Sequence, residues 1–339
     1  MIVDLRSDTV TRPSKEMIEA MMSAPTGDDV LNEDPTVNAL QDYSAQLFGM
    51  EDALYCSSGT QTNQIAINVH TSPGDEVICS SLSHIYIYEG GGVALNSLCS
   101  MAMLEGDRGR LTADQVRNLI NPDDIHRPIS RLVSLEDTVN KGGGAVYDFE
   151  EIKKIKSVAL QHGLGLHCDG ARLFNALHIN GLTPAQYAEP FDSISICLSK
   201  GLGAPVGSIL LGKKDFIKKA RRRRKSFGGG MRQAGIIAAA GLYALQNNIE
   251  RLKEDHNKAK LLATELMNLS WVKSIMPVDT NIVIFSLSKE NGAPEFVEKL
   301  KSKGILCFPF GPDKIRMVTH LDLMDDHYNY LFEKLKSIS

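Results

Sequence analysis

The sequence predicts an α/β protein with a mostly parallel central sheet, helices on both faces of that sheet, and a smaller C-terminal α/β unit. Strand-like apolar runs alternate with helical patterns from about residue 50 to 210. An Ala-rich segment follows the glycines at 228–230, and a second strand–helix alternation begins near Thr280. Strands interleaved with helices favour parallel pairing, because each helix returns the chain to the edge where the previous strand began.

The strands of the first part are expected where short β-branched and apolar runs lie between turn residues. In chain order they are Ala53 to Cys56, Glu76 to Cys79, Arg131 to Leu135, Leu164 to Cys168, Ile194 to Leu198 and Ser208 to Leu211. The helices between them include Thr62 to Val69, Thr112 to Ile120 and Phe149 to His162. Apolar residues in the last of these recur at the three-and-four spacing of an amphipathic helix.

The C-terminal part repeats the alternation on a smaller scale. The Ala-rich segment Met231 to Leu245 is expected to pack closely against a neighbour, and a long helix is expected over Ile249 to Leu269. The elements that follow are a strand at Ile282 to Leu287, a helix at Pro294 to Lys303, strands at Ile305 to Phe308 and Lys314 to Thr319, and a helix from Asp325. We therefore expect an N-terminal arm and large domain over 1–245 and a small domain over 246–339.

Composition and charge exclude several classes of protein. Of the 339 residues, 43% are hydrophobic and 23% are charged, which is typical of a soluble globular chain. Lys and Arg number 37 against 41 Asp and Glu, so no basic field predicts a nucleic-acid partner. No apolar run approaches the roughly 20 residues that span a bilayer, and the acidic N-terminus is unlike a signal peptide, so no membrane partner is expected.

The cysteines and histidines carry two further expectations. Six cysteines are scattered without a CxxC pair, several of them inside strand-like runs, which predicts reduced, buried thiols in a cytoplasmic protein. Nine histidines show no HExxH or similar ligand spacing, so no metal site is expected. The basic run 221–225 suggests nucleic acid at first sight. On a helix its charges spread around the circumference, which favours a solvated or subunit-facing helix.

A lysine stands where a buried strand ends. The strand at 193–198 runs into Ser199-Lys200-Gly201, and burying an ammonium group is costly. Asp169 ends the preceding strand in the same way, and Arg172 follows it by three residues. Because ligands of open α/β sheets bind at the carboxyl ends of strands, both side chains are expected to face one crevice. Taken alone, Lys200 would reach for solvent and Asp169 would be a turn or cap residue.

An anion-binding turn completes this set. Ser58-Gly59-Thr60 lies between a strand and a helix, where free N–H groups, hydroxyls and the helix dipole favour a phosphate. Phosphate cradle, lysine and aspartate together favour pyridoxal 5′-phosphate (PLP). The lysine amine condenses with the cofactor's aldehyde, and the aspartate pairs with the pyridine nitrogen. His84, which also follows a strand, is in position to stack on the ring; a lone histidine is more often structural.

Eight motifs in order resemble the low-specificity L-threonine aldolases, PLP enzymes of the aspartate-aminotransferase-like type I fold. The resemblance covers nearly the whole chain. Its motifs are DLRSDTVTRPS, GDDV…EDPT, SSGTQTNQ, SHIYIYE, HCDGARLFNA, CLSKGLGAPVGS, GGGMRQAG and IRMVTHLD.

The resemblance implies a role for each motif residue. Lys200 would hold PLP, Asp169 would face the pyridine nitrogen, and His84 would stack on the ring. Ser58, Gly59 and Thr60 would bind the phosphate, and Arg232 would reach a phosphate across a subunit interface. Arg172 would contact the ring hydroxyl and, with Ser7 and Arg316, would grip the substrate carboxylate, which the planar fork of arginine matches in two hydrogen bonds.

The implied reaction is cleavage of L-threonine, L-allo-threonine and related β-hydroxy-α-amino acids to glycine and an aldehyde. His84, or His126 on the distal side of the substrate pocket, would handle or orient the β-hydroxyl group. The implied assembly is a homo-oligomer with shared active sites, either a dimer or a dimer of dimers (a homotetramer). A β-eliminating lyase or an aminotransferase on the same fold is the alternative, because fold and cofactor do not determine the reaction.

Two segments depart from the pattern of the family. The family commonly reads ENTHN where this chain has Glu136-Asp137-Thr138-Val139-Asn140. It also commonly reads VYGEDP where this chain has Val30-Leu31-Asn32-Glu33-Asp34-Pro35. The cofactor assignment does not depend on these positions, whereas the preferred substrate and the stereochemistry at the β-carbon do.

Overall fold

A seven-stranded sheet forms the centre of the larger part of the molecule. The computed structural model describes residues 1–290 and 292–338. The strands lie in the order β2 (Asp52–Cys56), β8 (Ser208–Gly212), β7 (Ser193–Cys197), β6 (Gly165–Asp169), β5 (Ser130–Glu136), β3 (Glu76–Ser80) and β4 (Ser100–Leu104). Only β8 runs antiparallel to its neighbours among these strands. The predicted mostly parallel sheet is confirmed.

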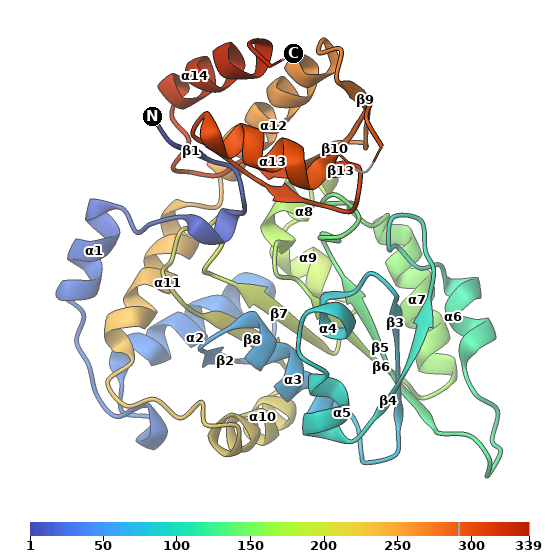
Figure 1. Ribbon diagram of the computed structural model, residues 1–339. Coiled ribbons are helices and arrows are strands. Elements are labelled where there is room, and N and C mark those ends of the chain that lie inside the picture. Colours follow the sequence, from blue (N-terminus) through green and yellow to red (C-terminus); the bar gives the residue numbers. More distant parts are fainter. Residues whose placement is uncertain (291, 339) are drawn as a thin grey trace.

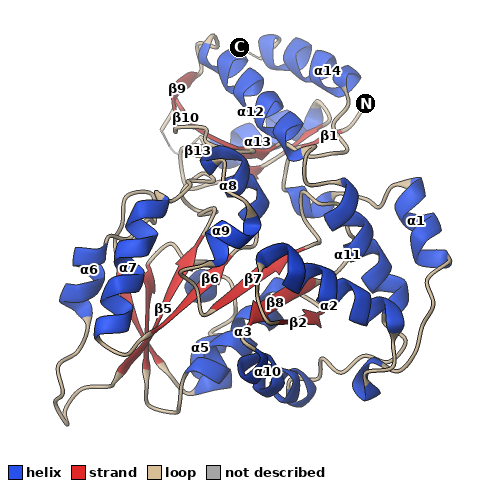
Figure 2. Ribbon diagram, turned by 180° about the vertical axis from the view of Figure 1, so that it is seen from behind, coloured by secondary structure: helices blue, strands red, loops and turns tan. Residues whose placement is uncertain are grey.

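Helices cover both faces of this sheet (Figures 1 and 2). One face carries α3 (Gly59–His70), α5 (Gly92–Ser97) and α10 (Lys214–Ser226). The other carries α2 (Pro35–Phe48), α6 (Ala113–Leu119), α7 (Phe149–Gln161) and α9 (Pro184–Ala188). The remaining helices of this part are α1 (Lys15–Met22), α4 (His84–Ile87), α8 (Leu173–Asn180) and α11 (Gly235–Asn247). The Ala-rich α11 packs against α1 and α2, as its small side chains predict.

The C-terminal part is a second α/β unit with its own hydrophobic core. Its antiparallel sheet has the order β12 (Phe308–Pro309), β13 (Lys314–Val318), β10 (Ile282–Leu287) and β9 (Val272–Ile275). It also contains α12 (Leu252–Met267), α13 (Ala293–Ser302), α14 (Asp325–Lys336) and the short β11 (Ile305–Leu306). Figure 1 shows this unit above the larger one.

The first residues of the chain join this smaller unit. β1 (Val3–Asp4) pairs in parallel with β11, and Val3 and Leu5 are buried in the smaller unit's core. The arm then returns to the larger unit, where the Thr11 hydroxyl donates to the Lys200 carbonyl at 3.0 Å. The arm thus connects both units, and the domain boundary between residues 245 and 246 stays a prediction.

The basic run on α10 differs from its sequence-based interpretation at one residue. Arg222, Arg223 and Lys225 are exposed, but Arg224 is buried. It donates to the Tyr55 carbonyl at 2.6 Å and pairs with the buried Asp29 carboxylate at 2.6 Å. The expectation of a wholly solvated or subunit-facing charge run is therefore wrong for Arg224, because one face of the helix packs on β2 and takes that guanidinium inside.

All six cysteines are buried and unpaired, as predicted. Within 1–290 and 292–338, no helix is both long enough and apolar enough to cross a membrane.

Candidate active site

Lys200 and Asp169 lie at the carboxyl ends of two neighbouring parallel strands. Asp169 is the last residue of β6, and Lys200 follows the end of β7 by three residues. Asp169 is opposite Ser195 in the register of this pair. Lys200 is half-buried, and its amine has no hydrogen-bond or ion-pair partner among the residues described. Both strand ends therefore lie at the same edge of the sheet, whereas the expectation that both side chains face one crevice stays a prediction.

The turn before α3 is built to receive an anion. Ser58 is the N-cap, in extended conformation, and its hydroxyl accepts from the Gln61 N–H at 3.2 Å. The N–H groups of Gly59 and Thr60 donate to no other described residue, as is usual in the first turn of a helix. A Cβ on Gly59 would lie 2.5 Å from the Cys197 sulfur, so only glycine fits there. The free donors are therefore held next to the end of β7.

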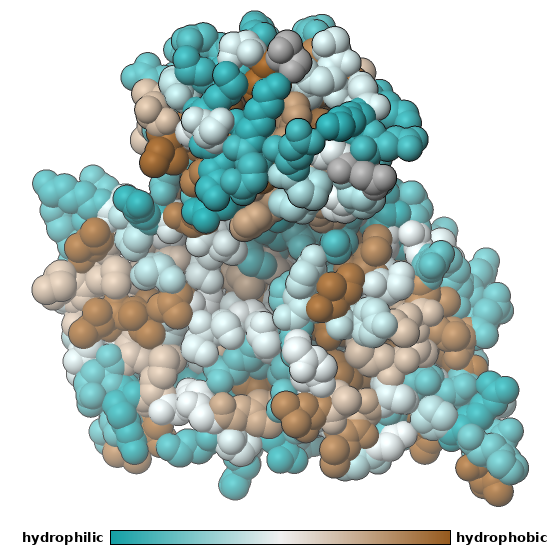
Figure 3. Space-filling model, viewed as in Figure 1, coloured by the Kyte–Doolittle hydropathy of each residue, from teal (hydrophilic) through white to brown (hydrophobic). Residues whose placement is uncertain are grey.

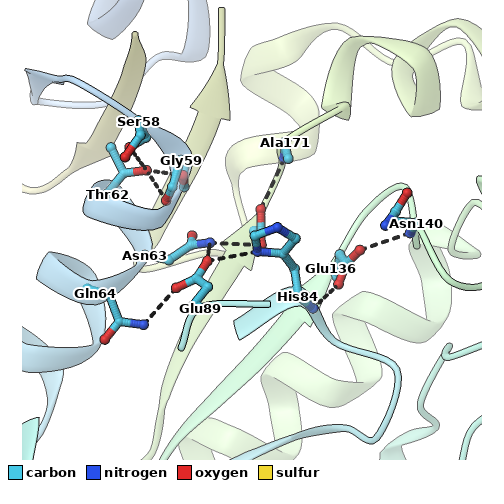
Figure 4. Close-up of polar contacts among 12 residues, drawn as sticks. Ser58, Gly59, Thr62, Asn63, Gln64, His84, Glu89, Glu136, Asn140 and Ala171 are labelled. Carbon is cyan, nitrogen blue, oxygen red and sulfur yellow. Dashed lines mark hydrogen bonds and ion pairs between the residues drawn. The ribbon is translucent and has the colours of Figure 1, made fainter. Parts of the chain in front are cut away.

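Asn63 on α3 holds the carboxylate of Asp169. Its side-chain N–H group donates to Asp169 Oδ2 at 2.8 Å and to Glu89 Oε1 at 2.9 Å. The other Asp169 oxygen accepts from the Ala171 N–H at 3.2 Å. Figure 4 shows Asn63, Glu89 and His84 converging on one point from separate segments. Buried polar groups need such partners, and here the partners set the orientation of the Asp169 carboxylate.

His84 at the start of α4 is held by two buried carboxylates. Its ring Nδ1 lies 2.9 Å from Glu89 Oε1, and its backbone N–H donates to Glu136 at 2.6 Å. The nearest polar side-chain atoms of His84, Glu89 and Asp169 are all within 4.8 Å of one another. Burial lowers the pKa of His84, but the hydrogen bond to Glu89 and the charge of Asp169 outweigh burial and raise it above its usual value.

Two arginines meet beside the N-terminal arm. Arg172 is buried and donates to both oxygens of Asp8, at 2.7 and 2.6 Å. Burial opposes charge on Asp8, but Arg172 holds the pKa of that carboxyl well below its usual range. Arg316 on β13 donates to Asn140 Oδ1 at 3.0 Å, while its Nε atom is buried without a described partner. Burial and the nearby Arg172 lower the pKa of Arg316 to about 10.

Part of this site lines a cavity of about 440 Å³ between the two units, whereas Asp169 and the turn Ser58-Gly59-Thr60 are not among the lining residues. Figure 3 shows the molecular surface drawn in at this junction. The lining brings together the predicted Ser7, His84, Arg172, Lys200 and Arg316. It also contains Thr9, Tyr88, Asn140, Lys141, Phe308, Pro309, Phe310 and Gly311.

His126 and Arg232 are not brought to this cavity within one chain. His126 lies between α6 and β5, at the amino ends of the parallel strands, with an 83% exposed side chain against Asp124. Within one chain the cavity is at the opposite, carboxyl ends of the strands, so the expected place of His126 on the distal side of the substrate pocket stays a prediction for a site shared between subunits. Arg232 lies between α10 and α11, is 57% exposed and pairs with Asp28 at 2.7 Å.

Sequence reasoning missed four residues that shape the site. Asp8, Asn63, Glu89 and Asn140 lie within or beside the motifs quoted above. Asp8 and Glu89 are acidic residues close in sequence to predicted ligands. That closeness is only a weak indication of a role in the site, because charged residues near a site are most often solvated. Each becomes recognisable only from its partner in the fold.

The residues described here fit PLP. A lysine without a partner, a carboxylate held at the next strand end and free amides at the N-terminus of α3 are the groups that such a cofactor requires. Fold and site together define a PLP-dependent enzyme of fold type I.

Comparisons place the chain within this class. A model of the β-eliminating lyase family matches residues 4–290. The low-specificity L-threonine aldolase of Escherichia coli K12 is 46% identical over 323 residues, 95% of each chain. The probable low-specificity L-threonine aldolase 2 of Arabidopsis thaliana is 40% identical over 343 residues, 98% of this chain and 97% of the plant protein. The chain belongs to the low-specificity L-threonine aldolase family, which confirms the resemblance carried by the motifs.

A solved structure gives the same fold. The threonine aldolase of Leishmania major has a TM-score of 0.84 at 22% identity, over 98% of each chain.

Proposed function

We propose that this protein is a PLP-dependent aldolase, a carbon–carbon lyase that cleaves L-threonine, L-allo-threonine and related β-hydroxy-α-amino acids to glycine and an aldehyde. The observation that carries the proposal is the cavity in which an unpartnered Lys200 amine lies with two arginines. Family membership supports it, since the relatives named above are L-threonine aldolases.

The cofactor would be held by groups that are already oriented. Lys200 would form the covalent link to its aldehyde, and Asp169, held by Asn63, would face the pyridine nitrogen. Ser58, Gly59 and Thr60 would bind the phosphate at the N-terminus of α3. His84 would stack on the cofactor ring, and Arg172 would donate a hydrogen bond to the ring hydroxyl.

Substrate binding is assigned to the residues between the two units. Ser7, Arg172 and Arg316 would hold the α-carboxylate, with Asp8 keeping the Arg172 guanidinium in one plane. When bound, PLP supplies an electron sink for the electron pair of the breaking Cα–Cβ bond. By holding the carboxylate, these residues would also set the orientation of the Cα–Cβ bond. Correct orientation raises the rate of bond cleavage, in addition to any gain in substrate affinity.

The β-hydroxyl proton is assigned to His84. Because Nδ1 is engaged by Glu89, Nε2 is the ring atom left to accept a proton. The position of His126 allows it to act only in the site of another copy of the chain.

We infer a homo-oligomer with shared sites, either a dimer or a dimer of dimers. Arg232 is exposed, as a residue that reaches a phosphate in a second subunit must be. Apolar Ile18 and Met22 on α1 are also exposed, at 48% and 81%. A native-mass measurement that finds an active monomer would contradict this inference.

Six buried thiols without a disulfide support the inference of a cytoplasmic protein.

The test is a Lys200→Ala variant beside a Lys213→Ala control at an exposed position. Purified wild-type protein and control should be yellow and release glycine and acetaldehyde from L-threonine. Lys200→Ala should lose reductive trapping of the cofactor and at least about 1,000-fold of the activity. If cyanoborohydride still traps the cofactor in Lys200→Ala, Lys200 is not the residue that forms the covalent link. Pyruvate and ammonia from L-serine, without glycine from threonine, would favour β-elimination instead.

A further inference from the structure

The described charged side chains that line the cavity are all positive. Its described side chains include four cations, Lys141, Arg172, Lys200 and Arg316, and no aspartate or glutamate. A cavity whose charged lining residues are all cations favours anionic ligands, because desolvated positive charges repel one another unless negative charge balances them.

Three of the four cations already have a counter-charge or a role in the proposed function. Arg172 is neutralised by the buried Asp8 in a two-bond pair. Lys200 would be consumed by the covalent link to the cofactor. Arg316 would meet the α-carboxylate that every amino-acid substrate carries. Lys141 is the cation left over.

Lys141 is held against the cavity by aromatic rings. Its Nζ lies 4.3 Å from the centroid of the Phe310 ring and 5.8 Å from that of Tyr88. Both rings line the same cavity, and Lys141 is half-buried. No carboxylate pairs with it among residues 1–290 and 292–338. Cation–π contacts of this kind fix the ammonium group in place while leaving its charge without a counter-ion.

The neighbouring residue connects Lys141 to the arginine pair. Asn140, one residue earlier, accepts from Arg316 at 3.0 Å and faces Arg172 at 3.5 Å. The segment 140–141 therefore lies along the cavity from the arginines, where an α-carboxylate would be held, to the aromatic rings of Tyr88 and Phe310. A group attached to the β-carbon of a substrate is the part that extends away from the α-carboxylate.

We propose that Lys141 is a specificity-determining residue that selects β-hydroxy-α-amino acids with a second carboxylate on the β-carbon, the chemistry of 3-hydroxyaspartate. The proposal rests on the proposed aldolase function. The cleavage keeps its balance: the Cα–Cβ bond breaks, the β-hydroxyl group loses its proton, and the β-carbon leaves as the aldehyde of glyoxylate. The α-carbon takes up a proton and leaves as glycine.

The experiment compares Lys141→Gln and Lys141→Arg with the wild-type holoenzyme. Wild type should cleave L-3-hydroxyaspartate with a higher kcat/KM than L-threonine. Lys141→Gln should lose about 10- to 100-fold on 3-hydroxyaspartate, the size of one charge-assisted hydrogen bond, and less than about threefold on threonine. Lys141→Arg, which keeps the charge, should restore at least part of the difference. The advantage of 3-hydroxyaspartate should also shrink as salt is added.

A binding measurement separates this inference from the function on which it rests. L-Aspartate has the second carboxylate but no hydroxyl group to cleave, so its Kd can be read from the absorbance of the bound cofactor. Aspartate should bind wild type more tightly than L-alanine does, and Lys141→Gln should remove that difference. Equal losses on threonine and 3-hydroxyaspartate, or an unchanged aspartate Kd, would overturn the role of Lys141. Failure of wild type to cleave threonine would overturn the aldolase proposal instead.

Discussion

Asn63 fixes the carboxylate of Asp169 through a hydrogen bond of 2.8 Å from Nδ2 to Oδ2. The direction of this bond is set by a buried chain of partners. Asn63 Oδ1 lies 3.2 Å from His167 Nε2, and His167 Nδ1 lies 2.8 Å from the Ser193 hydroxyl. Burial lowers the pKa of His167 to about 4, so the ring is neutral at pH 7 and donates from one nitrogen.

Replacing Asn63 should weaken cofactor binding. Asn63→Leu removes the donor to Asp169, and a hydrogen bond to a charged group is worth about 1.5–3 kcal/mol. The Kd of PLP, measured by equilibrium dialysis with the apoprotein, should rise roughly 10- to 100-fold. Gln64→Leu is the matched control, because Gln64 donates to Glu89 at 2.6 Å and not to Asp169. An equal effect of both substitutions would show that Asn63 acts only through packing.

Removing Asp8 should destabilise the fold. Asp8→Asn leaves the Arg172 guanidinium buried without its counter-charge, and breaking such a pair typically costs about 3–5 kcal/mol. Urea denaturation should show a corresponding drop in the free energy of unfolding. Glu19→Gln is the control, because its partner Lys15 is 3.8 Å away and both are exposed. That variant should change stability by less than about 0.5 kcal/mol.

Much of the fold could be predicted because it depends on local pattern. All six strands expected in the first part are in the central sheet. The edge strand β4 was missed because its sequence, SMAML, has no β-branched residue and is only partly buried. The joining of β1 to the smaller unit could not be read from a two-residue strand, since its pairing with β11 spans about 300 residues of sequence.

The candidate site was predictable only in part, because some of its residues depend on contacts with segments that are distant in sequence. Lys200 and Asp169 stand at strand ends, where the rule for open sheets locates ligands without any knowledge of contacts. Asn140 and Lys141, by contrast, take their role from β13 and from the loop around Phe310, which are far away in sequence. His126 shows a further limit, because its place in the sequence says neither which end of the sheet its loop occupies nor which subunit's site it serves.

The pH dependence of the reaction should report the contact between Glu89 and His84. With neutral His84 accepting the β-hydroxyl proton, kcat/KM falls as the pH drops through the pKa of this ring. Glu89→Gln removes the negative charge that raises this pKa, so the acid limb of the profile should move to lower pH. The measurement is kcat/KM for L-threonine between pH 5 and 9 in both proteins. An unshifted acid limb would mean that His84 is not the group that titrates.

Asp137, where the family commonly has asparagine, should make stability depend on pH. Its carboxyl group is buried, accepts from the Tyr187 hydroxyl at 2.6 Å, and burial raises its pKa to about 7. Because the folded-state pKa lies above the unfolded value of about 4, the wild-type chain loses stability as the pH rises between those values. Asp137→Asn keeps an oxygen for Tyr187 and cannot ionise.

The stability of Asp137→Asn relative to the wild type should therefore increase as the pH rises. At about 1.4 kcal/mol per pKa unit, its advantage at pH 8 relative to pH 4 is at most about 4 kcal/mol. Thermal unfolding of both proteins at pH 5, 6, 7 and 8 should show the difference in Tm growing in favour of Asp137→Asn. Asp124→Asn serves as the control, since that carboxyl is exposed and its pKa lies below the usual value, held by its bonds to His126. Parallel Tm curves for wild type and Asp137→Asn would contradict a neutral Asp137 in the folded protein.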